Sequence, residues 1–211
     1  MTQPPAVVFL LDVDNTLLDN DRITADLKRH LTQAFGAERQ ERYWTILEER
    51  RTELGYTDYL GALQRYRAEN LGDPHFLQMS FYLMNYPFGD RLFPGAREVI
   101  EHLSAWGPTV ILSDGDVIFQ PRKVQRSGLY DAVEGRVLIY IHKEQQLADV
   151  EQRYPAHHYV LVDDKLRILT AVKKIWRTPP DHGLPLPGAL RPRPQGALYV
   201  PASGHYDRAH R

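Results

Sequence analysis

The sequence predicts an α/β fold, with a Rossmann-like parallel sheet and a helical insertion after its first strand. Three observations lead to this fold class. Short apolar runs alternate with stretches of helical spacing over most of the chain, which is the pattern of repeated βα units. The first run, residues 6–11, has no polar alternation and so indicates a strand buried on both faces of a parallel sheet. The stretch from Asp19 to Asp90 shows helical spacing alone.

Composition limits the possible functions. The chain has 211 residues, 43% of them hydrophobic and 25% charged, which suits one globular core with a modest insertion. Cysteine is absent, which excludes disulfides, cysteine-ligated zinc and thiol catalysis. The formal net charge of -1 gives no basic field that would favour nucleic acid, and no apolar run is long enough to span a membrane. We expect a cytoplasmic protein that binds neither nucleic acid nor membrane; its oligomeric state stays open.

Four helices are predicted in the insertion. Apolar residues spaced one turn apart place the first two over residues 23–35 and 38–54, each followed by glycine as a C-terminal cap. A third covers residues 57–71. The pair Asp73-Pro74 predicts the start of the fourth helix, which must end before Pro87.

The remaining strands and helices alternate after Asp90. Strands are predicted at residues 109–112, 137–141 and 158–162, with helices between them and a last helix that ends near Trp176. The proline-rich stretch 178–196 excludes a regular helix or interior strand, so a loop is expected there. Residues 197–200 are predicted to form a final edge strand, and the basic tail is interpreted as solvated.

Polar residues follow each of the four main strands. Asp12 and Asp14 come after the first strand, Ser113 after the second, Lys143 after the third, and the pair Asp163-Asp164 after the fourth. The carboxyl ends of parallel strands lie at one edge of the sheet, where ligands bind. Acids gathered there need a metal ion or a shared proton between them. The sequence therefore predicts a charged site at this edge.

The signature Asp-Val-Asp-Asn-Thr at residues 12–16, followed by the serine, the lysine and the Asp-Asp pair, resembles the haloacid dehalogenase superfamily of hydrolases. The resemblance runs from Val7 to about Trp176. It implies a sheet of order 3-2-1-4-5, an α/β core formed by residues 1–18 and 89–211, and an all-helical cap over residues 19–88.

The resemblance also implies roles for the site residues. Asp12 would be the nucleophile and Asp14 the general acid and base. The phosphoryl group would be bound by Ser113 and Lys143, with Asp114 and Gly115 beside them and backbone N–H groups near residues 13, 14 and 114. Mg²⁺ would be held by Asp12, the Asp14 carbonyl, and Asp163 or Asp164. The choice between these two acids stays open, because Ile168 stands where many family members have a second acid.

The leading functional interpretation is a Mg²⁺-dependent phosphatase that hydrolyses a small phosphorylated molecule through an aspartyl-phosphate. The alternatives are a haloacid dehalogenase, a non-catalytic phospho-ligand-binding protein, and transfer of the phosphoryl group to an acceptor other than water. The position of Asp14 argues against the dehalogenase, which needs neither a protonated leaving group nor Mg²⁺.

Other polar residues are interpreted as structural or solvent-exposed. The favoured interpretation is a solvated helix face for five residues of the insertion: Arg42, Arg50, Arg51, Tyr56 and Tyr59. Asp114 and Asp116 around Gly115 fit a polar turn. The histidines His142, His157 and His158 are expected to be structural or exposed, because no metal-ligand spacing joins them to the acids.

Overall fold

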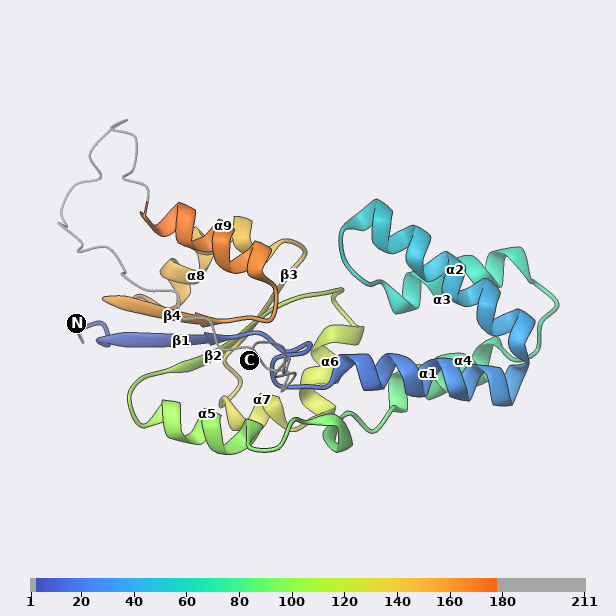
Figure 1. Ribbon diagram of the computed structural model, residues 1–211, viewed down its shortest axis with the longest axis horizontal. Helices are drawn as coiled ribbons and strands as arrows, with labels where there is room; N and C mark the ends of the chain where they lie inside the picture. The colour runs from blue at the N-terminus through green and yellow to red at the C-terminus, as the bar shows by residue number, and fades with distance from the viewer. Residues whose placement is uncertain (1–2, 178–211) are drawn as a thin grey trace, which may run out of the picture.

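The computed structural model describes residues 3–177 and contains a parallel sheet at one end and helices at the other (Figure 1). Its strands are β1 (Val7–Leu11), β2 (Thr109–Asp114), β3 (Val137–Tyr140) and β4 (His158–Val162). They pair in the order β3-β2-β1-β4, all parallel. This α/β architecture confirms the predicted fold class. The expected fifth strand and the proline-rich stretch lie outside the described residues.

The second strand extends two residues further than the sequence predicted. Ser113 pairs with Ile139 and Asp114 with Tyr140, so both polar residues belong to the strand and not to the turn after it. The pairing with β3 extends β2 as far as the carboxyl-terminal edge of the sheet, where the strands end. Ser113 is therefore held by a regular ladder, which fixes its backbone position more firmly than a loop would.

Helices cover both faces of the sheet. In Figure 1, α8 (Leu147–Arg153) and α9 (Leu166–Arg177) lie on one face and α5 (Ala96–Ser104) on the other. Val8, Leu10 and Leu161 are fully buried in the cluster beneath α8 and α9. Helices cover the other face of the sheet less completely: Phe9 is only partly buried there and lines an apolar groove of about 580 Å³ beside α5. The expected burial of the first strand on both faces is thus only partial.

Four helices form the insertion, which we call the helical segment (residues 20–85). They are α1 (Asn20–Phe35), α2 (Ala37–Leu54), α3 (Tyr59–Glu69) and α4 (Phe76–Asn85), and no strand lies among them. Asp19 accepts a hydrogen bond from the Arg22 amide and Asp58 one from the Gly61 amide, as N-terminal caps do. The third helix begins two residues later than predicted because Asp58 caps it. Within residues 3–177, no helix is both long and apolar enough to cross a membrane.

Short connections join the helical segment to the rest of the chain. After α4 a 3₁₀ turn, η1 (Phe88–Arg91), leads back toward the sheet. The Asp19 amide donates to the Arg91 carbonyl at 2.8 Å, and the Phe93 amide donates to the Leu17 carbonyl at 2.9 Å. The outgoing and returning chains therefore run side by side and are hydrogen-bonded to each other.

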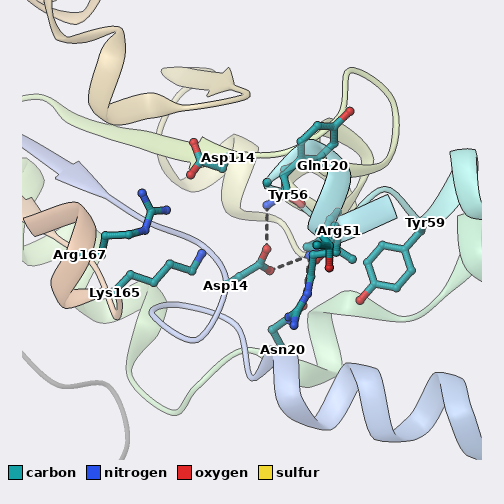
Figure 2. Close-up of a pocket in the computed structure, with 13 residues that line it drawn as sticks. Asp14, Asn20, Arg51, Tyr56, Tyr59, Asp114, Gln120, Lys165 and Arg167 are labelled. Atoms are coloured by element: carbon teal, nitrogen blue, oxygen red, sulfur yellow. Dashed lines mark hydrogen bonds and ion pairs between the residues drawn. The ribbon is translucent and has the colours of Figure 1, made fainter. Parts of the chain in front are cut away.

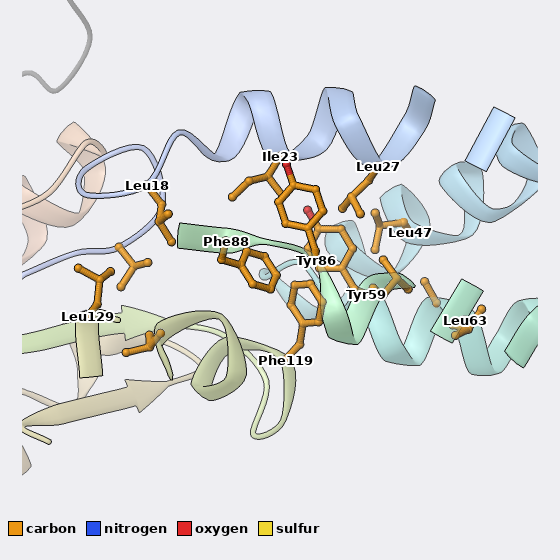
Figure 3. Close-up of a cluster of buried hydrophobic side chains, with 14 of the residues drawn as sticks. Leu18, Ile23, Leu27, Leu47, Tyr59, Leu63, Tyr86, Phe88, Phe119 and Leu129 are labelled. Carbon is orange, nitrogen blue, oxygen red and sulfur yellow. The ribbon is translucent and has the colours of Figure 1, made fainter. Parts of the chain in front are cut away.

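A continuous hydrophobic core runs from the sheet into the helical segment (Figure 3). At the junction, the Phe119 ring of α6 (Phe119–Arg126) lies 4.7 Å from the Tyr59 ring of α3 and 5.7 Å from the Phe88 ring. Such aromatic pairs contribute roughly 0.5–1.5 kcal/mol beyond the burial of their area. This packing holds the helical segment over the edge of the sheet where the polar residues lie. After α6, the short α7 (Leu129–Ala132) leads to β3.

Candidate active site

The loop after β1 is shaped by Asn15. This residue has a positive φ of 59°, a conformation that asparagine tolerates better than most residues. Its side-chain oxygen accepts hydrogen bonds from the Asn20 and Asp21 amides at 2.9 and 3.2 Å, which satisfies free N–H groups at the start of α1. The Val13 carbonyl accepts from the amides of residues 16, 17 and 18. This compact turn leaves Asp12 and Asp14 at the edge of the sheet.

Lys143 lies at the centre of the site. Its ammonium Nζ is 2.5 Å from Asp12 Oδ1 and 2.7 Å from Asp163 Oδ2, and it donates to the Leu112 carbonyl at 3.1 Å. All three charged side chains are at most 2% exposed. Lys143 is therefore a buried lysine and not a surface one. A 3₁₀ turn, η2 (Lys143–Gln145), places the lysine directly after β3.

Three carboxylates gather beside this lysine. Asp12, Asp163 and Asp164 each offer an oxygen, and these oxygens lie within 4.8 Å of one another. Asp12 Oδ2 and Asp164 Oδ1 are buried without a hydrogen-bond partner among the described residues. A buried carboxylate oxygen without a partner is costly, and a hard cation with oxygen ligands would relieve that cost. The donor set fits Mg²⁺.

Burial and charge act in opposite directions on these groups. Burial raises the pKa of Asp12 to about 6, although Lys143 opposes the shift. For Lys143, burial lowers the pKa, but Asp12 and Asp163 outweigh it and the net shift is upward. Lys143 therefore stays charged. A cation bound by the acids would favour the ionised form of Asp12 that a nucleophile requires.

Asp14 is held by two side chains of α6. Lys123 Nζ lies 2.6 Å from Asp14 Oδ1, and Gln120 Nε2 donates to Asp14 Oδ2 at 3.2 Å. Gln120 also donates to Ser113 Oγ at 2.9 Å. The two contacts fix the direction of the Asp14 carboxyl group and connect it to Ser113.

The sequence analysis did not predict Gln120 and Lys123 as residues of the site. Both are at most 4% exposed, on the same side of α6 as the buried Phe119 and Val124. A glutamine and a lysine within the apolar stripe of a helix are the signal that could have found them.

Asp114 and Gly115 make contacts within the protein that differ from the phosphoryl contacts implied by the family resemblance. Asp114 Oδ1 accepts from the Lys143 amide at 2.7 Å, so it positions the chain that carries the central lysine. The Gly115 amide donates to the Tyr140 carbonyl and is not free for a phosphoryl group. A Cβ at Gly115 would lie 2.5 Å from the Gln120 side chain, so the glycine makes room for that residue. Asp116 accepts from the amides of residues 118 and 119 at the start of α6, as a polar turn residue would.

A cavity of about 420 Å³ opens in front of Asp14, between the sheet edge and the helical segment (Figure 2). Arg51, Tyr56 and Tyr59 line it. The interpretation as a solvated helix face is wrong for Tyr59, which is 4% exposed, whereas Arg51 is exposed and lines the cavity as well. Arg42 pairs with Glu69 and Arg50 with Asp58, and neither lines this cavity.

The histidines lie outside the acid cluster. His157 and His158 are exposed and His142 is half-buried, which agrees with the expectation that they are structural or exposed. His142 nevertheless touches the helical segment, because a Cβ at Gly55 would lie 2.8 Å from its ring. Gly55 has a φ of 79°, so the loop after α2 comes close to the residue that precedes Lys143.

Known proteins resemble this chain in both sequence and fold. A model of the haloacid dehalogenase-like hydrolase family matches residues 7–174. A structure from Burkholderia xenovorans LB400, described as a haloacid dehalogenase-like hydrolase, is 63% identical; the match covers 82% of this chain and 81% of that chain, with a TM-score of 0.79. No curated protein matches.

More distant structures share the fold alone. L-2-haloacid dehalogenase from Xanthobacter autotrophicus, with chloropropionic acid covalently bound, is 20% identical, with 82% and 74% of the two chains covered and a TM-score of 0.52. YfnB from Bacillus subtilis, a HAD hydrolase bound to magnesium, is 20% identical, with 77% and 79% covered and a TM-score of 0.51. The family match over most of the chain, together with the acids and lysine at the sheet edge, shows that this protein belongs to the haloacid dehalogenase-like hydrolases.

Proposed function

We propose that the protein is a Mg²⁺-dependent phosphatase that hydrolyses a small phosphorylated molecule through an aspartyl-phosphate. The observation that carries the proposal is the group of three acids near Asp14, two of which, Asp12 and Asp164, have a buried oxygen without a partner among the described residues. Neighbours of the same fold include a dehalogenase and a magnesium-bound protein, so the fold alone does not select between the reactions. The choice between the two reactions therefore rests on the side chains of this site.

Asp12 is the proposed nucleophile. One of its oxygens attacks phosphorus, the bond to the leaving oxygen breaks, and Asp14 gives that oxygen a proton. Asp14 then takes a proton from water as the water oxygen attacks phosphorus, which releases inorganic phosphate and restores Asp12. Lys143, between Asp12 and Asp163, neutralises charge on the transferred group, and Ser113 hydrogen-bonds one of its oxygens.

The acids would hold the metal. Asp12, the Asp14 backbone carbonyl, and Asp163 or Asp164 are the proposed ligands, and bound Mg²⁺ screens the repulsion between the carboxylate and the phosphate dianion. We also propose that the helical segment acts as a cap over the core. Its loop at Gly55 meets His142 beside the site, and six of its side chains line the cavity together with Gly55.

A dehalogenase is the second candidate, because it also uses the first aspartate as nucleophile. It needs no proton for the departing halide and no cation for its substrate. Asp14, held at hydrogen-bonding distance by two side chains, and the metal-binding set have no task in that reaction. Transfer of the phosphoryl group to an alcohol would use the same residues as hydrolysis.

The test compares three assays on the purified chain. Inorganic phosphate release is measured from alkyl and aryl phosphates with Mg²⁺ and with chelator, and halide release is measured from a 2-haloacid. We expect phosphate release that chelator abolishes and Mg²⁺ restores. Release that is indifferent to chelator would contradict the metal assignment, and rapid halide release would favour the dehalogenase.

A further inference from the structure

The cavity in front of Asp14 carries more positive than negative charge. Its lining includes four basic side chains and two acidic ones: Arg51, Lys123, Lys165 and Arg167 against Asp14 and Asp114. Two of these six residues form one local pair, since Lys123 lies 2.6 Å from Asp14. Asp114 accepts from the backbone of Lys143. Three basic residues of the lining have no such partner in the cavity. We call them the cationic rim: Arg51, Lys165 and Arg167.

The formal charge of the catalytic cluster is balanced without these three cations, although Lys165 also acts on Asp12 and Asp164 through its charge. Its three carboxylates are balanced by the Lys143 ammonium and by the two charges of the proposed divalent cation. The cationic rim is therefore free to attract a negative group of the substrate, and in a cleft such charges also raise the local concentration of anions.

The rim surrounds the cavity from two directions. Figure 2 shows Lys165 and Arg167 on one side of Asp14, and Arg51 with Tyr56 on the other. Burial raises the pKa of Asp164 and of Asp114, and the nearby charge of Lys165 opposes both shifts. Arg51 pairs with Glu48, and the two side chains are 58% and 48% exposed; such an exposed pair contributes little, so a ligand can displace it. Arg167 donates through Nη1 to Glu144, whose side chain is only 10% exposed, so Arg167 would keep this pair and offer a ligand its other N–H groups.

We propose that the substrate is a small phosphomonoester that carries a second anionic group, a carboxylate or a phosphate, bound by Lys165, Arg167 and Arg51. The proposal rests on the phosphatase function above and names its substrate class. The cavity volume of about 420 Å³ is near the lower end of ligand pockets, which suits a compact molecule. Arginine binds both groups through two parallel hydrogen bonds.

The experiment compares substrates with a matched carbon chain. The probes are 3-phosphooxypropanoate, its neutral amide, and propane-1,3-diyl bisphosphate, each assayed for phosphate release with Mg²⁺. We expect kcat/KM to be at least about tenfold higher for an acid probe than for the amide, the scale of one charge-assisted hydrogen bond. The two acid probes distinguish a carboxylate from a second phosphate. If the amide is hydrolysed as well as both acids, the inference is wrong; if none is hydrolysed, the proposed function itself fails.

Single substitutions test whether the cationic rim causes the preference for the acid probes over the amide. Arg51→Gln, Lys165→Met and Arg167→Gln should each reduce the ratio of acid to amide several-fold, chiefly through KM of the acid. A loss that is equal for acid and amide would mean that the residue binds the transferred phosphoryl group and not the second anion. Arg42→Gln is the matched control: it lies on the same helix and pairs with Glu69 at 2.6 Å, but it lines a different cavity. Its ratio should equal that of the unchanged protein, and an equal fall there would overturn the assignment.

Discussion

The sheet edge and the helical segment treat charge in opposite ways. At the sheet edge, Lys143 and Asp163 are fully buried and Asp12 nearly so. In the helical segment, several ion pairs are exposed on both sides, as in the pair of Arg65 with Glu49, whose side chains are 39% and 40% exposed. Buried pairs cost several kcal/mol per ion in desolvation, whereas exposed pairs contribute at most about 1 kcal/mol. Charge that is held at such a cost indicates chemistry, and charge at the surface indicates solvation or recognition.

The largest effect should come from the nucleophile. Asp12→Asn is expected to lower kcat by roughly 10⁴–10⁶-fold, since an amide is a poor nucleophile. Phosphate release measures the loss, and thermal unfolding checks that the fold is retained. Asp116→Asn is the control, because Asp116 caps α6 without contacting the cluster and asparagine can also cap. An Asp12→Asn protein that still turns over would contradict the covalent mechanism.

Asp14→Asn should have the next largest effect. Loss of acid–base help typically costs about 10²–10⁴-fold, and the loss should be smaller for aryl phosphates, because their leaving groups need less protonation. The ratio of alkyl to aryl rates is therefore the measurement. An equal loss on both substrates would remove Asp14 from proton transfer and leave it a positioning role.

Metal binding should stabilise the sheet edge directly. At 100 times its Kd, Mg²⁺ adds about 2.7 kcal/mol, or roughly 5–10 °C in Tm for a domain of this size. Asp164→Asn should reduce the shift, because its buried Oδ1 belongs to the acid group. Sodium chloride at equal ionic strength controls for screening. An unchanged shift in the variant would assign the metal to the other acids.

Asp26, like Asp58, is a buried and ion-paired acid of the helical segment. It is 6% exposed, accepts from Tyr86 at 2.6 Å and pairs with Arg91 at 2.6 Å. Asp26→Asn should cost about 1–3 kcal/mol of unfolding free energy with little effect on kcat. Arg42→Gln, an exposed pair, should cost at most about 1 kcal/mol.

The pH dependence of this cost has a defined sign. Burial raises the pKa of Asp26, but the hydrogen bonds from Tyr86 and Arg91 outweigh it and lower the pKa. The stabilisation is therefore present above the unfolded pKa of about 4 and is lost as the pH falls below it. The difference in Tm between the unchanged protein and Asp26→Asn should shrink below pH 4. A difference that stays constant there would contradict this account.

The smallest effect tests the contact between the two regions. Gly55→Ala places a methyl group against His142 at a positive φ and should cost about 1 kcal/mol, with a several-fold change in KM as the loop moves. Gly36→Ala is the control: its φ of 90° is also strained, but a Cβ there meets nothing within 4 Å. If both variants change KM alike, the contact with His142 has no part in substrate binding.

The sequence by itself determined the strands, the helical segment and the principal acids. Polar residues directly after apolar runs identified Asp12, Asp14, Lys143, Asp163 and Asp164, because the ends of parallel strands meet at one edge. This inference needs only periodicity and topology. It could not tell that Asp114 would bind the Lys143 amide or that the Gly115 amide would pair with Tyr140, since strand register is set by the partner strand.

Tertiary structure alone decided which other side chains reach the site. Gln120 and Lys123 lie more than a hundred residues from Asp14 in sequence, and only the packing of α6 against the sheet edge brings them together. Arg51 and Arg42 lie nine positions apart on one helix, yet they line different cavities. Local pattern gives a helix its faces, but which face meets a ligand depends on how the helical segment is seated on the core, and that is set by long-range contacts such as Tyr59 with Phe119.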